Sequence, residues 1–151
     1  MNRRFRQLRA FWQLPLGDRA GLLAAWGLLL SIDALCWLMG ARCCLRWLRR
    51  AAGFQKTARP PDSWVICQAE LVSRAARHTP RPTTCLIRAM ALWFLLTRRG
   101  VACDIILGVQ KKMRHTLEAH AWVEWKGRPL LETADVRQRY AAFERPLSSL
   151  L

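Results

Sequence analysis

The sequence predicts an α+β fold in which a buried helix packs on one face of an antiparallel sheet. Three observations support this prediction. Residues 85–99 form a nearly all-apolar run that ends at Gly100, which is typical of a buried helix. Residues 101–109 are apolar and rich in β-branched side chains, and residues 117–125 alternate strictly, so both read as strands. The chain has 151 residues, enough for one domain with a real core.

The charge of the chain is strongly basic and unevenly spread. Its 25 Lys and Arg against 10 Asp and Glu give a formal net charge of +15. Residues 1–50 hold nine arginines against two aspartates, whereas residues 116–151 hold equal numbers of basic and acidic residues. The 52% of hydrophobic residues excludes a disordered basic tail. The excess favours acidic partners of any kind, but most tryptophans lie in apolar helical patterns, so we expect no nucleic-acid partner.

The first helix is predicted over residues 20–41, which contain only one charged side chain, Asp33, between Arg19 and Arg42. This segment is long enough to cross a membrane. A carboxylate in mid-bilayer costs about 2.5–3.5 kcal/mol, however. We therefore expect a helix, or a helix pair bent near residues 31–33, that packs on the domain or on a partner. A peripheral membrane contact and a membrane span are the alternatives.

A second helix is predicted over residues 64–78, after a polar segment at 53–63 that has the composition of a linker. Asp62 or Ser63 is the expected N-cap. Residues 79–84 contain two prolines, which cannot continue a helix because they lack the backbone donor. The next helix must therefore start after them.

The helix over residues 85–99 has the clearest boundary signals in the chain. Thr83 or Thr84 is its expected N-cap. Cys85 falls in its first turn, where exposed backbone N–H groups and the positive end of the helix dipole favour a thiolate. The positive charges of Arg81 and Arg88 nearby are also expected to favour the thiolate of Cys85. Cys67 and Cys103 lack such a position and are expected in the core.

The strand over residues 117–125 carries the one histidine of interest, His120, on its more polar face. A turn at 126–127 leads into a third strand at 128–132. A three-residue loop with a bulge would pair Glu124 with Arg128 and place Glu132 directly across from His120. A two-residue loop would place Thr133 there instead.

These residues form a candidate Cys-His-acid triad of Cys85, His120 and Glu132, with Asp135 as the alternative acid. If the buried helix packs on the sheet, its N-terminal thiol can meet the imidazole, and the carboxylate fixes the imidazole tautomer. Each residue also has an ordinary structural interpretation: a small buried thiol, a hydrogen-bonded strand histidine and a solvent-facing carboxylate.

Two segments of the sequence resemble a known protein family. Residues 83–112 and 117–132 contain Cys-Leu-x-Arg-Ala-x-Ala-Leu, Arg-Arg-Gly, Leu-Gly-Val and Ala-His-Ala-Trp-Val-Glu in this order. They resemble the B2 leader peptidases of lasso peptide biosynthesis, a transglutaminase-like branch of the papain-type cysteine peptidases. The resemblance covers about residues 60–145 and implies that Cys85 is the nucleophile, His120 the general acid/base and Glu132 the third member, although the family often has Asp there.

The resemblance also implies a domain division and partners. Residues 1–55 would form an N-terminal basic, apolar helical segment, and residues 56–151 the transglutaminase-like peptidase domain. The substrate would be the leader of a lasso peptide precursor. A separate leader-recognition protein (B1, the recognition element) would deliver it, and an ATP-dependent macrolactam cyclase would act next. The apolar and basic N-terminal surface would serve as a docking site.

The expected chemistry needs no cofactor and no metal, since the six cysteines and three histidines show no zinc-site spacing. The backbone N–H of Cys85 is the expected oxyanion donor, with Gln68 as a further candidate. No signal peptide is recognised, so a cytoplasmic location is expected, either free or at a membrane.

Two other functions are alternatives to the peptidase. One is a transglutaminase-type acyl transfer enzyme, and the other is a non-catalytic basic adaptor that binds membranes or nucleic acid.

Overall fold

The computed structural model describes residues 16–53, 60–111 and 116–149. The four strands form one antiparallel sheet in the order β3-β2-β1-β4. The predicted α+β class is confirmed, and the predicted boundary between residues 55 and 56 lies outside the described residues. The elements in chain order are α2 (Leu16–Ala52), α3 (Asp62–Ala76), α4 (Cys85–Arg98), β1 (Asp104–Lys111), β2 (Leu117–Trp125), β3 (Arg128–Leu130), α5 (Val136–Arg139), β4 (Ala141–Ala142) and the 3-10 turn η2 (Leu147–Ser149).

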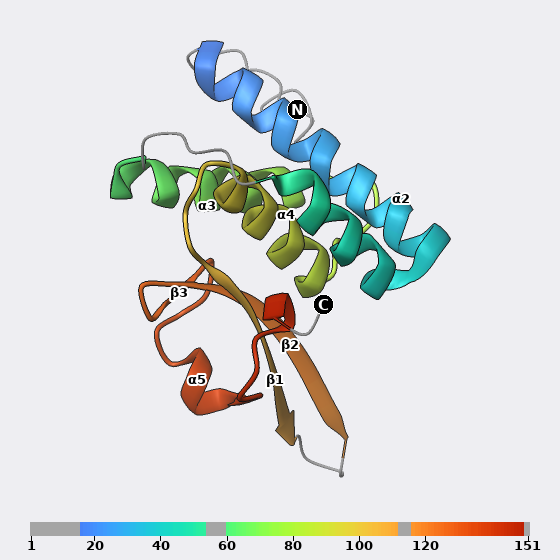
Figure 1. The fold of residues 1–151 in the computed structure, drawn as a ribbon, viewed down its shortest axis with the longest axis vertical. Coiled ribbons are helices and arrows are strands. Elements are labelled where there is room, and N and C mark those ends of the chain that lie inside the picture. The colour runs from blue at the N-terminus through green and yellow to red at the C-terminus, as the bar shows by residue number, and fades with distance from the viewer. Residues whose placement is uncertain (1–15, 54–59, 112–115, 150–151) are drawn as a thin grey trace, which may run out of the picture.

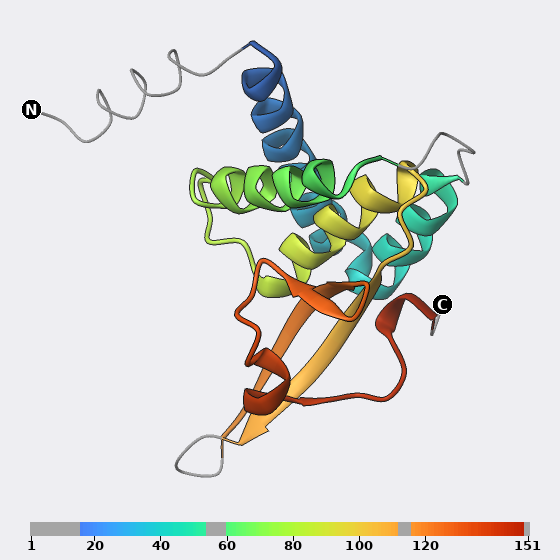
Figure 2. The same cartoon turned by 90° about the vertical axis from the view of Figure 1, so that its left-hand side faces the viewer.

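The three long helices gather on one side of the molecule and the sheet extends away from them, with α5 beside the lower part of the sheet (Figures 1 and 2). The main core joins α2, α3 and α4 to one face of the sheet through Ile105, Ala121 and Val123. Residues of opposite parity, Ile106 and Trp122, form a second, smaller cluster with α5 and the residue after it. Strand alternation therefore separates a helix-covered face from a face that holds α5.

Helix α4 is buried because its side chains are apolar nearly all round. Eight of its fourteen residues are buried, and Trp93 donates its indole N–H to the Cys103 carbonyl oxygen at 3.2 Å. Thr84 is the N-cap, as predicted, and its hydroxyl accepts from the Ile87 N–H at 3.3 Å. Gly100, just after the end of α4, has a φ of 72°, a conformation that glycine adopts freely.

Helix α3 starts two residues earlier than predicted and uses a different cap. Its N-cap is Pro61, with no side-chain hydrogen bond, so the expected cap at Asp62 or Ser63 is wrong. Asp62 instead accepts two bonds from the Lys126 ammonium group at 2.8 and 2.9 Å, which link the start of α3 to the turn after β2. Cys67, expected in the core, is exposed on this helix.

Helix α2 bends at Gly40, which has φ 78° and ψ 156°, and not near residues 31–33 as expected. Glycine tolerates this backbone conformation because it has no Cβ. The chain then turns back, and its second half runs along α4 (Figure 1). Ser31, at the predicted bend, donates its hydroxyl to the Gly27 carbonyl oxygen and leaves the helix continuous.

The segment Arg19–Ala52 is long and apolar enough to cross a membrane by length and composition, a test that a core helix also passes. One of its faces is a core face, because Ala25, Leu29 and Ile32 are buried with the residues of α3 and α4. The other face exposes Trp37, at 81%, and Leu38. The helix therefore has two apolar faces, of which only one is covered within the described chain.

Leu29→Ala should lower the free energy of unfolding by about 2–5 kcal/mol, because it removes a side chain that is fully buried in the main core. The control is Leu23→Ala on the exposed face of the same helix, expected to change it by at most about 0.5 kcal/mol. Urea unfolding followed by tryptophan fluorescence measures both. Equal losses would contradict the packing of α2 on α3 and α4.

Candidate active site

Cys85 is the first residue of α4 and is partly exposed. The capping bond of Thr84 uses the N–H of Ile87, and the N–H of Arg88 donates to the Thr84 carbonyl oxygen at 3.2 Å. The N–H groups of Cys85 and Leu86 precede these bonds, and such groups have no acceptor within a helix. The thiol therefore lies beside donors that can bind an anionic oxygen.

A small cavity lies beneath Cys85, between the start of α4 and the edge of the sheet. Arg88 and Glu132 also line it, together with residues of β2 and the end of β3. Arg88 Nε is buried and has no hydrogen-bond partner among the described residues. An unpaired buried donor is uncommon in proteins, and this cavity of about 10 Å³ has room for at most one water molecule beside it.

His120 lies on β2 and holds Glu132 by a direct contact. Its Nε2 is 2.9 Å from Glu132 Oε1, and the two side chains are only 16% and 23% exposed. The imidazole ring stacks on Tyr140, with ring centroids 5.0 Å apart, and lies 6.1 Å from the ring of Trp122. The ring is therefore held by one carboxylate and by aromatic neighbours.

The expected strand register does not explain the contact between His120 and Glu132. The turn has two residues, Lys126 and Gly127, so the predicted three-residue loop with a bulge is wrong. Continued regularly, this register would place Thr133 across from His120. Instead β3 ends at Leu130, and Leu131 takes a left-handed φ of 67° that redirects the chain. Glu132 thereby reaches the imidazole.

Cys85 and His120 both lie next to Glu132 but are not bonded to each other. In the described part of the chain no hydrogen bond joins the thiol to the imidazole, and His120 does not line the cavity beneath Cys85. The reason is strand alternation: α4 covers the face of Ala121, whereas His120 shares the face of Trp122. Glu132, at the edge of the sheet beyond β3, is the common neighbour of both.

Gly108 makes room for the aromatic neighbours of His120. It pairs with His120 across the β1–β2 ladder. A Cβ at Gly108 would lie 2.9 Å from the Trp122 ring and 3.0 Å from Tyr140 Cβ. The Leu-Gly-Val motif noted in the sequence thus has a steric explanation, because only glycine permits this close approach.

A buried carboxylate anchors α5 under the same face. Glu124 accepts from the Trp122 indole N–H at 2.9 Å and from Arg137 Nε at 2.6 Å. The hydrogen bonds from Arg137 hold the pKa of Glu124 below its usual value. This network fixes Trp122, and with it the aromatic surface beside the imidazole.

The remaining predicted site residues lie elsewhere. Gln68, on α3, does not line the cavity beneath Cys85. Asp135 is exposed at the N-cap of α5, where a hydrogen bond from the Thr133 side chain lowers its pKa, and Glu132 is the carboxylate that contacts His120. Burial raises the pKa of Cys103 to about 12, which makes it a poor nucleophile. Among the described residues no three His, Cys, Asp or Glu side chains gather as a metal site would require.

Comparison with protein families gives one match. Residues 28–145 match the model of the transglutaminase-like superfamily. The chain belongs to the transglutaminase-like superfamily. This superfamily includes cysteine peptidases and acyltransferases. The matched range contains α4, the whole sheet and the three residues Cys85, His120 and Glu132. No curated protein and no solved structure matches the chain significantly.

Sequence reasoning missed three residues that shape the candidate site: Gly108, Leu131 and Tyr140. A glycine inside an apolar strand signals close approach of another group and could have drawn attention to Gly108. Tyr140, the only tyrosine of the chain, lies twenty residues from the histidine that it contacts. The left-handed conformation of Leu131 has no sequence signal, because a leucine rarely adopts it.

Gly108→Ala should displace the Trp122 and Tyr140 rings and destabilise the fold by about 1–3 kcal/mol through overpacking. The displaced rings would also move His120. Thermal unfolding and the near-ultraviolet circular dichroism of the aromatic side chains measure the effect. Gly27→Ala, in α2, is the control, since no atom lies within 4 Å of a Cβ there. An unchanged aromatic spectrum in Gly108→Ala would contradict the described packing.

Proposed function

We propose that this protein is a cysteine peptidase that removes the leader from a lasso peptide precursor. The observation that carries the proposal is the position of Glu132, which bonds to His120 and lines the cavity beneath Cys85. In a member of the transglutaminase-like superfamily, a thiol at a helix start with an imidazole and a carboxylate nearby supports nucleophilic catalysis. The lasso peptide substrate rests on the motif resemblance.

In the proposed reaction, the Cys85 thiolate attacks the carbonyl carbon at the end of the leader. The thiol lies at the start of α4, and the Arg88 guanidinium group lines the same cavity. The negative charge that develops on the carbonyl oxygen is stabilised by the backbone N–H of Cys85. The oxygen thus lies at the start of α4.

His120 supplies and removes the protons. Glu132 occupies Nε2, so Nδ1 is the nitrogen that exchanges a proton with the thiol and the substrate. The imidazolium protonates the departing amine as the carbon–nitrogen bond breaks and a thioester remains. His120 then takes a proton from water, which attacks the thioester, breaks the carbon–sulfur bond and restores the thiolate. This step requires the imidazole to approach the thiol at the sheet edge.

The proposed pathway includes a separate leader-recognition protein and an ATP-dependent macrolactam cyclase. The exposed side of α2, with Trp37 and Leu38, offers an apolar surface for such a docking partner or for a peripheral membrane contact. A cytoplasmic location, with or without membrane association, is part of the same proposal. The motif resemblance is the reason for choosing these partners.

Cys85→Ala and His120→Ala should each abolish leader cleavage, because they remove the nucleophile and the proton carrier. Glu132→Gln should lower kcat by about 100-fold, since the imidazole loses its carboxylate partner. Asp135→Asn, a matched change of an exposed carboxylate three residues away, should leave kcat unchanged. Mass spectrometry of a precursor peptide, incubated with the full-length protein and its leader-recognition protein, measures these rates.

The same spectra separate hydrolysis from acyl transfer. Hydrolysis releases a leader with a free carboxylate, whereas transfer to an added amine gives a new amide of different mass. Cleavage that persists in Cys85→Ala would contradict the mechanism. An amide product as the main species would favour the acyl transfer alternative.

His120→Ala should also slow the alkylation of Cys85 by iodoacetamide at pH 7 by about tenfold, because the proposed mechanism makes His120 the base that takes the thiol proton. Cys43 and Cys67 are exposed on other helices and serve as internal references in the same sample. Peptide mapping by mass spectrometry gives the rate at each thiol. If Cys85 in the unmodified protein reacts no faster than Cys67, the non-catalytic adaptor is favoured.

A further inference from the structure

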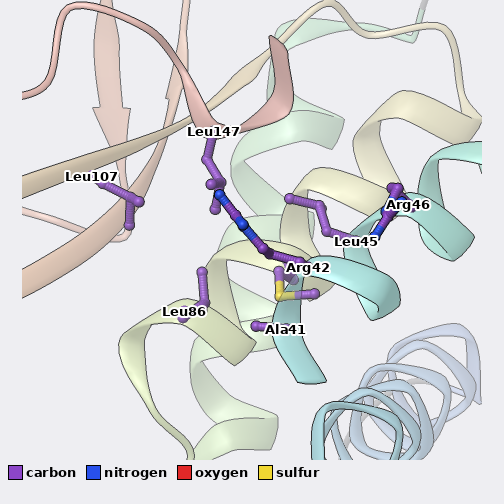
Figure 3. A pocket seen from close by; sticks show the side chains of 8 residues that line it. Ala41, Arg42, Leu45, Arg46, Leu86, Leu107 and Leu147 are labelled. Carbon is purple, nitrogen blue, oxygen red and sulfur yellow. The ribbon is translucent and has the colours of Figure 1, made fainter. Parts of the chain in front are cut away.

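Figure 3 shows a groove of about 440 Å³ beside α4. It shares no lining residue with the cavity beneath Cys85. This volume falls within the range of roughly 300–1,000 Å³ that ligand pockets have. The buried side chains of Leu45 and Met90 contribute to its floor. Leu86, the residue directly after Cys85, also lines it. One end of the groove therefore reaches the first turn of α4, the turn that begins at Cys85.

The wall opposite α4 is held in place by hydrogen bonds. Leu147, in η2, and Leu107, in β1, both line the groove. The Ser148 hydroxyl donates to the Asp104 carboxylate at 2.8 Å, and Arg49 donates to the Ser148 carbonyl oxygen at 3.5 Å. These bonds attach η2 both to β1 and to α2. The groove is thus bounded by anchored elements on each side.

Two arginines of α2 give the groove a positive charge. Arg42 and Arg46 line it, and the Arg42 side chain extends across the groove toward Leu147 (Figure 3). In the part of the chain that the structure describes, neither guanidinium group forms an ion pair with a carboxylate. Arg46 makes only a 3.7 Å contact to the Cys43 sulfur. The groove is therefore apolar at its floor and cationic at its rim.

The spacing of these arginines matches carboxylates on an extended peptide. Four residues apart on a helix, Arg42 and Arg46 are separated by about 6 Å along the axis. Side chains two residues apart on an extended chain lie about 6.6 Å apart and point the same way. The residues between them point to the opposite side, toward the floor. An alternating acidic and apolar segment thus satisfies both the rim and the floor.

We propose that this groove binds an extended, alternating acidic and apolar segment of the peptide substrate, next to the bond that is cleaved. The inference rests on the proposed peptidase function, because the groove reaches the first turn of α4, which begins at Cys85. Carboxylates of the segment pair with Arg42 and Arg46, and its apolar side chains cover Leu45 and Met90. The groove thereby selects substrates by charge as well as by shape.

The test measures binding separately from cleavage by using the Cys85→Ala protein. The probes are three fluorescein-labelled peptides that share the sequence Gly-Ser-X-Leu-X-Leu-Gly-Ser, with X as Glu, Gln or Lys. Fluorescence anisotropy should show the Glu peptide binding at least tenfold more tightly than the Gln peptide, with a strong dependence on salt. Adding Arg42→Glu and Arg46→Glu should remove this preference and favour the Lys peptide.

The matched control adds Arg50→Glu and Arg77→Glu, which change the net charge equally at exposed positions outside the groove. The control should keep the preference for the Glu peptide within twofold. Equal binding of the Glu and Gln peptides would overturn the proposal, as would an equal loss in the control. Sedimentation of each protein tests whether a second copy of the chain occupies the groove. If the groove variants change self-association and leave peptide binding unchanged, a second copy fills the groove and the proposal is wrong.

The two proposals fail in different ways. If the Glu peptide binds as expected but the unmodified protein cleaves no precursor, the peptidase function is wrong and the groove is still a peptide site. If the precursor is cleaved but binding ignores the charge of Arg42 and Arg46, only the groove assignment is wrong. In the active protein, the groove variants should raise KM for the precursor at least tenfold with kcat unchanged.

Discussion

The burial of α4 between the other helices and the sheet is the interaction on which the rest of the molecule depends. Its side chains are apolar on nearly every side, so the helix is stable only when α2, α3 and the sheet cover it together. That packing fixes the position of its N-terminus, where Cys85 meets the edge of β2 and the residues after β3. The geometry of the site follows from the requirement to bury this one helix.

The two faces of the sheet have different tasks in this arrangement. The face of Ala121 and Val123 supports α4 and the thiol, whereas the face of Trp122 supports the imidazole through aromatic contacts. Strand alternation would keep the two groups apart if the sheet continued past β3. Because β3 ends early, the edge of β2 near His120 is open to Glu132, which contacts His120 and lines the same cavity as Cys85. A short edge strand is therefore a condition for the proposed chemistry.

Charge is distributed according to the same architecture. Arg42 and Arg46 of α2 line an apolar groove that reaches the first turn of α4, while Glu124 anchors α5 and Glu132 contacts the imidazole. The range that matches the transglutaminase-like superfamily, residues 28–145, contains α4 and the whole sheet. This match leaves open the choice of substrate, which the groove and the motif resemblance address in the two proposals.

The sequence by itself determined the features that depend on neighbouring residues. The N-cap at Thr84, the stop at Gly100 and the strict alternation over 117–125 were predictable because caps and periodicity act over a few residues. The same local reasoning identified Cys85, His120 and Glu132 as candidates. Only the tertiary structure decided how they lie: the left-handed Leu131 brings Glu132 to His120, and the packing of α4 on the other face of the sheet sets the place of Cys85. Such packing has no local signature, since it depends on which surfaces the whole chain must bury.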